Sequence, residues 1–226
     1  MSEWWTYRLE DFLLFSPRVY WRTIELHNAA LWPLHVFTLI AGIIILLLVA
    51  RRPRSSVRWL GLLLAIAWIF VGWSFLWTRY ATINWAAAYV APAFVVEGVL
   101  FLVAGSLLNG LTFGRRGFVG WTGYFLLGFA LAGQPSLAPL QGRGWASSEV
   151  FGIAPDPTAI ATLGLLLLAR GRLVPLLLPI PVLWCLLSGI TLRTMGEPQA
   201  WAHFSALALA AAACIWTIAR QRGSPP

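Results

Sequence analysis

The strongest candidate for chemistry in this sequence is a carboxylate, Glu97, inside the apolar run AAAYVAPAFVVEGVLFLVAG. Counted from Asn84 at 1.5 Å per residue, it lies about 20 Å along a membrane-spanning helix, near the bilayer midplane. A carboxylate there costs at least ~2.5 kcal/mol to insert and normally faces a cavity, a partner or a proton path. Pro92, five residues earlier, frees a backbone carbonyl at which the helix can kink. We interpret Glu97 as a proton-titrating residue; the alternative is a protonated acid whose hydrogen bond fixes helix packing.

Three histidines, His27, His35 and His203, form the second group of candidates. His27 and His35 fall in the same predicted helix, where eight residues separate them by about 12 Å along the axis. That separation is too large for joint ligation of one metal ion, because helical ligand pairs stand four residues apart. We therefore take His35 and His203 as proton-carrying candidates beside Glu97, with packing histidines as the alternative. We expect no metal site and no other cofactor.

A further polar cluster is expected at the outer rim of the bundle. It comprises Arg22, Glu25, His27, Asn28 and Arg193. Arg22, Glu25 and Asn28 follow one another at spacings of three, so they share one helix face. Arg193 is expected to pair locally with Glu197. We favour a polar cap that ties the N-terminal segment to the bundle over a binding site.

The composition defines the elements that must position these residues. The chain has 226 residues, of which 59% are hydrophobic and 11% charged, and its mean hydropathy is +0.76. Soluble domains carry about 25% charged residues. Helices and closed barrels alone satisfy every backbone group in lipid, and long unbroken apolar runs favour helices. We predict an all-α polytopic bundle. All sixteen basic residues are arginine, which excludes a lysine Schiff base such as that of retinal pigments.

Seven apolar segments predict about seven transmembrane helices. They are residues 26–50, 59–78, 84–108, 118–134, 156–169, 173–192 and 199–219. Whether the fifth fully spans is left open, because Pro155 and Pro157 bracket its start and Arg170 closes it early. The expected organisation is an interfacial amphipathic segment at 1–25, a transmembrane domain at 26–219 and a short tail at 220–226. Within the first segment, aromatic residues such as Trp4, Trp5, Phe12 and Phe15 are typical of the headgroup level.

Arginine placement predicts the orientation. Alternate connections carry ten arginines and no carboxylate, whereas the other set carries six arginines and seven carboxylates. The positive-inside rule puts the first set in the cytoplasm, which gives an N-out, C-in chain. Arginines at helix ends also account for the net charge of +8, so we expect no nucleic acid as a partner. Arginine-only basic usage with abundant Ala, Gly and Leu is typical of GC-rich bacteria, so we expect the bacterial inner membrane.

Two resemblances bear on function. The opening run WWTYRLEDFLLFSPRVYWRTIELHNAALWP resembles a family of uncharacterised bacterial multi-pass membrane proteins that are often labelled permeases. This resemblance implies no established activity. Asp11, Glu25 and Asn28 are faintly similar to the start of the alkaline ceramidase superfamily, whose members share a His-x-x-x-His pair on the last helix. Here Leu207 stands four residues after His203, so the zinc site of that family is not carried over.

Three functions fit these features. We favour a small-solute transporter or channel that uses Glu97, with proton coupling, and thus a protein that is not an enzyme. The alternatives are an outer-leaflet intramembrane lipid hydrolase and a non-catalytic membrane scaffold. The expected partners are membrane lipids and a small-molecule or ion substrate. A transporter requires a polar cavity that reaches Glu97, whereas a hydrolase requires metal or lipid near the outer histidines.

Overall fold

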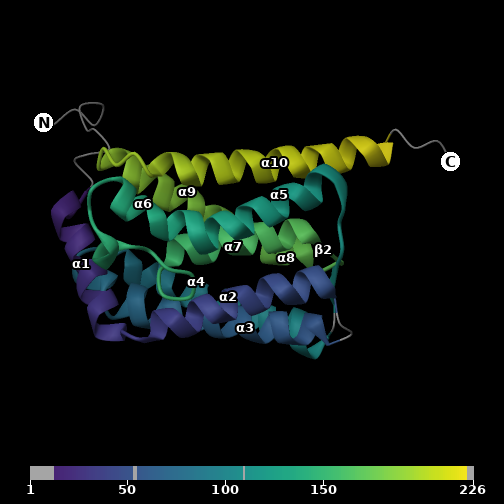
Figure 1. Cartoon of the computed structure of the whole chain (residues 1–226), viewed down its shortest axis with the longest axis horizontal. Helices are drawn as coiled ribbons and strands as arrows, with labels where there is room; N and C mark the ends of the chain where they lie inside the picture. Colours follow the sequence, from purple (N-terminus) through teal and green to yellow (C-terminus); the bar gives the residue numbers. More distant parts are fainter. Residues whose placement is uncertain (1–12, 53–54, 109, 223–226) are drawn as a thin grey trace, which may run out of the picture.

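The computed structural model describes residues 13–52, 55–108 and 110–222, and the long helices of this part lie side by side (Figure 1). Its α-helices are α1 (Pro17–Leu31), α2 (Leu34–Arg51), α3 (Ser56–Val71), α4 (Ala87–Phe101), α5 (Gly117–Gly128), α6 (Gln134–Leu140), α7 (Pro155–Leu168), α8 (Val174–Leu177), α9 (Pro179–Thr194) and α10 (Ala200–Arg222). The predicted all-α class is confirmed.

Short irregular helices extend or connect these elements. They are η3 (Gly72–Trp77), η4 (Tyr80–Thr82), η5 (Leu102–Leu107), η6 (Phe129–Gly133) and η7 (Trp145–Ser147). Two strands of two residues each, β1 (Thr112–Phe113) and β2 (Ala169–Arg170), pair antiparallel and join two connections at one end of the bundle. We call this end the β end, and the opposite end, which α1 covers, the α1 end (Figure 1).

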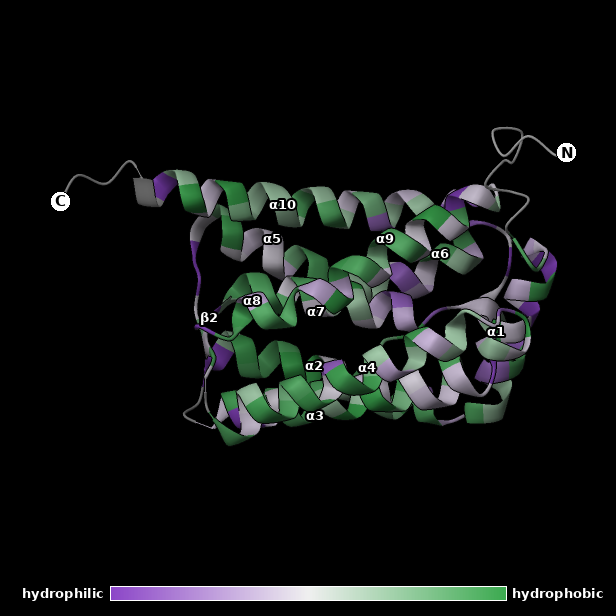
Figure 2. Cartoon of the chain, turned by 180° about the vertical axis from the view of Figure 1, so that it is seen from behind, coloured by the Kyte–Doolittle hydropathy of each residue, from purple (hydrophilic) through white to green (hydrophobic). Residues whose placement is uncertain are grey.

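Five helical stretches of the described chain are long and apolar enough to cross a membrane. They are Leu34–Arg51, Ser56–Thr82, Ala87–Leu107, Val174–Thr194 and Ala200–Arg220. Apolar residues cover most of the bundle between its two ends, and hydrophilic residues collect toward those ends (Figure 2). The chain therefore has the character of a multi-pass membrane protein, as its composition predicted.

Helix α7 is the centre of the bundle. All fourteen of its residues are buried, and it packs against α3, α5, α9 and α10. At 1.5 Å per residue it is about 21 Å long, shorter than the hydrocarbon core of a bilayer. Because protein rather than lipid surrounds it, its ends can be irregular without exposing backbone groups to hydrocarbon.

Helix α1 lies across the end of the bundle, and its bounds correct two expectations (Figure 1). It begins at Pro17, where the Ser16 side chain accepts a hydrogen bond from the Val19 amide, and it ends at Leu31. The expected boundary at residue 25 thus falls inside α1, and the predicted apolar helix 26–50 is broken before Pro33. His27 and His35 lie on different helices, so the prediction that they share one is wrong. At the other end of the chain α10 continues to Arg222, past the expected start of the tail.

Aromatic residues attach α1 to the bundle. The partly buried Phe15 ring lies 5.6 Å from that of Tyr80, and Tyr20, which is buried, lies 5.8 Å from Tyr80. This agrees with the expected burial of Phe15; Trp4, Trp5 and Phe12 lie outside the described residues. The segment up to α1 is therefore joined to the bundle by ring packing, each pair adding about 0.5–1.5 kcal/mol beyond area burial.

Candidate functional site

Asp156 occupies the first turn of α7 and is completely buried. Pro155 starts this helix at a position where no backbone donor is required, so the acid stands at the positive end of the helix dipole. Its Oδ1 accepts a hydrogen bond of 2.8 Å from Trp184 Nε1, and its Oδ2 accepts one of 2.8 Å from Ser188 Oγ. Trp184 and Ser188 are four residues apart on α9, so both donors come from one helix face.

His203 of α10 completes this arrangement. Its Nε2 lies 2.9 Å from Asp156 Oδ2, and both side chains are fully buried. Two charges can be kept in such a place only if each has a close partner, because the desolvation cost is several kcal/mol per ion. We call Asp156 and His203 the central pair.

The central pair differs from a hydrolytic triad in one respect that decides its chemistry. Ser188 donates its hydroxyl proton to the Asp156 carboxylate and not to the imidazole of His203. A serine nucleophile requires a hydrogen bond to its general base, with the carboxylate on the far side of the histidine. The geometry therefore favours holding or exchanging a proton over acyl transfer.

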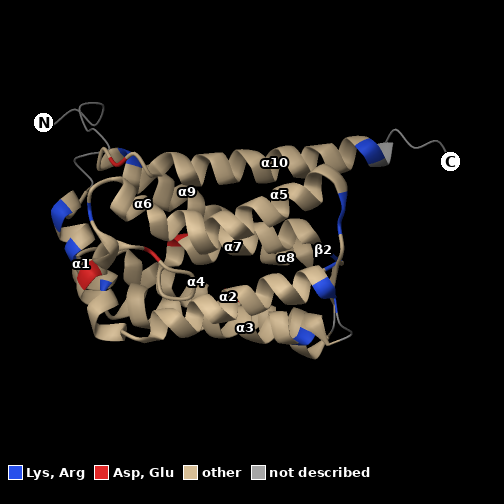
Figure 3. Cartoon of the chain, in the orientation of Figure 1, with Lys and Arg blue, Asp and Glu red and all other residues tan. Residues whose placement is uncertain are grey.

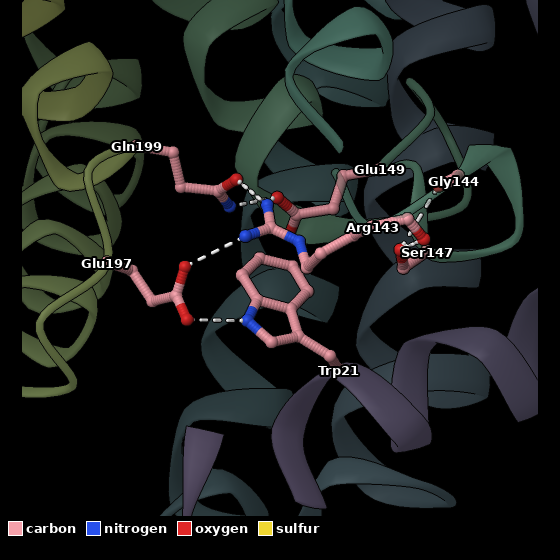
Figure 4. Close-up of polar contacts among 7 residues, drawn as sticks. All are labelled: Trp21, Arg143, Gly144, Ser147, Glu149, Glu197 and Gln199. Atoms are coloured by element: carbon pink, nitrogen blue, oxygen red, sulfur yellow. Dashed lines mark hydrogen bonds and ion pairs between the residues drawn. The ribbon is translucent and has the colours of Figure 1, made fainter. Parts of the chain in front are cut away.

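A second polar group lies between the central pair and the α1 end, and Figure 4 shows its members. We call it the Arg143 cluster; it consists of Trp21, Arg143, Glu149, Glu197 and Gln199. Arg143 donates to Glu197 Oε2 at 2.8 Å and to Gln199 Oε1 at 2.6 Å. Its guanidinium lies 3.7 Å from the ring centroid of Trp21, and Trp21 Nε1 donates to Glu197 Oε1 at 2.9 Å. These contacts join α1, the connection before α7 and the start of α10.

Glu149 connects this cluster to the central pair. It is buried, and its Oε2 accepts a hydrogen bond of 2.9 Å from Gln199 Nε2. Burial raises the pKa of Glu149 well above its usual value, and the negative charge of Asp156 raises it further, while Arg143 counteracts both. Because His203 follows Gln199 by four residues, one turn of α10 spans the two groups. The Arg143 cluster and the central pair are thus neighbouring buried polar groups, and the charge of Asp156 acts on Glu149.

Glu97 is fully buried, as expected of a residue that faces the bundle interior. Neither of its carboxylate oxygens has a hydrogen-bond partner among the described residues, so the expected bond to a carbonyl or aromatic side chain is not found. Phe94, one turn earlier on α4, contacts Trp184 at 5.0 Å and Trp68 at 4.5 Å between ring centroids. Glu97 is therefore one helical turn from Phe94, whose ring contacts that of Trp184, a donor to Asp156.

A small cavity adjoins Trp184 and Ser188, the two donors to Asp156. It has a volume of about 60 Å³ and is lined by residues of α1, α4 and α9 together with Phe75 and Tyr80, including Tyr20, Asn84, Trp184 and Ser188. A space of this size accommodates water molecules, whereas sites for organic ligands occupy about 300–1,000 Å³. The two donors to Asp156 thus line a space that admits water and protons.

The other two histidines form a separate group near α1. Asn28 Nδ2 donates to the carbonyls of Ala146 and Ser148 at 2.8 Å each, and Asn28 Oδ1 lies 3.1 Å from His35 Nε2. His27 is buried beside Phe75, and burial lowers its pKa to about 4. His35 thus has a partner that fixes the connection before α7, but it has no contact with Asp156.

The remaining members of the expected rim lie at the surface. Arg22 and Glu25 form an ion pair of 2.9 Å with side-chain exposures of 66% and 31%, so it contributes little to stability. Arg193 is exposed, with its guanidinium 5.8 Å from the Trp201 ring. The expected pair between Arg193 and Glu197 is wrong, because Glu197 binds Arg143. The expected rim is therefore divided between the surface residues Arg22, Glu25 and Arg193 and the buried residues His27 and Asn28, and none of them belongs to the Arg143 cluster.

Sequence reasoning missed most of the buried site. Asp156, Glu149 and Arg143 belong to the connections whose charges predict the orientation, and the sequence gives no signal that singles out Gln199. One usable signal existed: the sequence Pro-Asp-Pro directly before an apolar run places an acid in the first turn of a membrane helix. In the described part of the chain, no three or more His, Cys, Asp or Glu side chains form a group that could hold a metal ion.

Comparison with known proteins adds a family but no activity. A family model described as a family of unknown function, DUF6064, matches residues 17–223, so the chain belongs to this family. No curated protein and no solved structure matches the chain.

Proposed function

We propose that this member of a family of unknown function is a proton-coupled membrane transporter for a small solute. The observation that carries the proposal is the complete burial of three ionisable side chains, Glu97, Asp156 and His203, inside an apolar helix bundle. Such groups are costly in a membrane protein and mark ion or proton pathways. Here they lie on three different helices, α4, α7 and α10, that surround the middle of the bundle.

The central pair is the proposed proton-holding element. A carboxylate and an imidazole 2.9 Å apart can share a proton and pass it to water in the adjoining cavity. Glu97, which has no hydrogen-bond partner among the described residues, supplies a neutral acid that can ionise when water or solute reaches it. His203 replaces His35 in this route, because His203 is the histidine that contacts Asp156.

The proposed transport cycle requires the α1 end to open. The cavity of about 60 Å³ is too small for an organic solute, so the described conformation is closed. In the Arg143 cluster, Trp21 of α1 donates a hydrogen bond to Glu197, just before α10. The connection before α7 is tied to the same segment by the bonds from Arg143 to Glu197 and Gln199 and by the bond from Gln199 to Glu149. We propose that separation of these groups gives water and solute access to Asp156.

We further propose seven crossings with the β end in the cytoplasm of a bacterial inner membrane. Five of these crossings are the long apolar stretches. The other two are the continuous helix from α5 to α6 and the central helix α7. At the β end, arginines occur without any carboxylate among the described residues, whereas the α1 end carries both (Figure 3). Reporter fusions near Ser55 and at Pro226 should both report the cytoplasm; a periplasmic signal from either would overturn this topology.

Proton flux into proteoliposomes tests the transport proposal. Vesicles that contain the purified chain and a trapped pH dye are energised by a potassium diffusion potential. Proton flux is measured without added solute and with mixtures of amino acids, sugars or organic acids. We expect flux above that of empty vesicles in at least one condition, lost in Glu97→Gln and in Asp156→Asn.

The exposed acid Glu25 provides the control. Glu25→Gln changes the same functional group at the surface and should keep the wild-type flux. Among the described residues, the Glu25 carboxylate forms an ion pair with Arg22 only. Flux equal to that of empty vesicles in every condition, or unchanged flux in Glu97→Gln, would refute the proposal.

A further inference from the structure

A broad groove lies at the β end, on the side of the bundle formed by α5 and α10. It has a volume of about 650 Å³. Its lining includes Arg115, Arg116, Phe118, Arg170, Trp216 and Arg220. These residues come from the start of α5, from β2 and from the last turns of α10, three parts of the chain that are far apart in the sequence.

Four arginines give the groove a strongly positive potential. Arg115 is held in place, because its Nε donates to the Ala169 carbonyl at 3.1 Å and its Nη1 to Thr217 Oγ1 at 3.2 Å. Arg220 lies with its guanidinium 5.0 Å from the ring of Trp216. Within the described residues no aspartate or glutamate occurs at this end (Figure 3). A groove of this kind attracts anions.

The same groove has an exposed aromatic wall. Phe118 and Trp216 are about half exposed, and their rings meet edge to face at 5.9 Å. On α10, Ile215 and Ile218 are exposed beside them, which continues the apolar surface that membrane helices present to lipid. The groove therefore lies where the apolar surface meets the basic end of the bundle.

We propose that this groove binds the phosphate headgroup of an anionic phospholipid, with the acyl chains along Phe118, Trp216 and the adjoining face of α10. Guanidinium groups match phosphate oxygens in pairs, and basic pockets between transmembrane helices suit acidic headgroups. A soluble phosphate would be attracted by the arginines alone. The exposed aromatic wall next to them is what selects a lipid.

Native mass spectrometry of the full chain in detergent tests the site. The probes are phosphatidylglycerol, phosphatidylcholine and inorganic phosphate, each titrated separately. The variant is the double change Arg116→Gln with Arg170→Gln, because both side chains are exposed and neither hydrogen-bonds the fold among the described residues. The matched control is Arg18→Gln with Arg22→Gln at the α1 end.

We expect the wild type to retain phosphatidylglycerol in preference to phosphatidylcholine. Each arginine near a headgroup contributes about fivefold in affinity, so the double variant should bind phosphatidylglycerol roughly 30-fold more weakly. The control should bind as the wild type does. Equal binding of the two lipids, an unchanged affinity in the double variant, or displacement of the lipid by millimolar inorganic phosphate would each overturn the assignment.

Discussion

We expect the coupling free energy between Asp156 and His203, measured by a double-mutant cycle, to be the largest between any two side chains of this bundle. We consider Asp156→Asn, His203→Gln and the double variant. Asparagine keeps one acceptor oxygen, so it can satisfy Trp184 or Ser188 but not both. The lost bond to a charged acceptor costs about 1.5–3 kcal/mol, and breaking a fully buried pair costs about 3–5 kcal/mol in total.

The double variant should cost less than the sum of the single variants. Once Asp156 is neutral, removal of His203 no longer leaves an uncompensated charge in the interior. The coupling free energy should therefore be at least about 1.5 kcal/mol. It can be measured by unfolding the protein in mixed micelles with increasing dodecyl sulfate, followed by tryptophan fluorescence.

The pair Arg22 and Glu25 is the matched control for this cycle. It has the same contact distance, 2.9 Å, but its side chains are 66% and 31% exposed. A cycle on Arg22→Gln and Glu25→Gln should give at most about 0.5 kcal/mol, because water screens the charges. The reasoning fails if the coupling at the buried pair does not exceed that at the exposed pair.

Three further outcomes follow from particular contacts. Arg143→Met should lower the free energy of unfolding by about 1–3 kcal/mol in the same assay, since it leaves the Glu197 carboxylate with a single strong donor; Arg193→Met, an exposed control, should change it little. The pKa of His27 is lowered to about 4 in the fold, so as the pH falls His27 becomes protonated in the unfolded chain before it does in the folded protein. The wild type should then lose about 2–3 kcal/mol more than His27→Gln as the pH falls from 7 to 4 in thermal unfolding. Gly61→Ala should cost about 1–3 kcal/mol by differential scanning fluorimetry, because its Cβ would lie 2.8 Å from the Phe101 carbonyl oxygen; Gly128→Ala, where nothing lies within 4 Å, should be tolerated.

The membrane helices could be predicted from the sequence because a side chain that faces lipid must be apolar. The expected segment 84–108 corresponds to α4 and η5, which together end at Leu107, and 173–192 corresponds to α8 and α9. The first segment was wrong for a specific reason. Leu31 and Trp32 are apolar, so hydropathy continued across the break at Pro33, although proline disfavours helix in the residue before it.

The site could be predicted only where a single residue violated the local pattern. Glu97 is an acid inside an apolar run, so its burial followed from the sequence alone. Asp156 and His203 are 47 positions apart, and each looked ordinary near the end of a helix. Which polar residues of the α1 end meet depends on how the helices pack, and that packing leaves no periodic signal in the sequence.

Enclosure of α7 by other helices explains why the polar residues gather where they do. Thr158 and Thr162 bond back to the carbonyls four residues earlier, and Thr162 also accepts from Trp68 Nε1. A helix facing hydrocarbon would lose stability with an aspartate and such a polar series, whereas a central helix can satisfy each group from its neighbours. The same enclosure limits the open space beside the two donors to Asp156 to a cavity of about 60 Å³. A central helix can thus carry ionisable groups under the cover of its neighbours, and the proposed transport cycle requires this property.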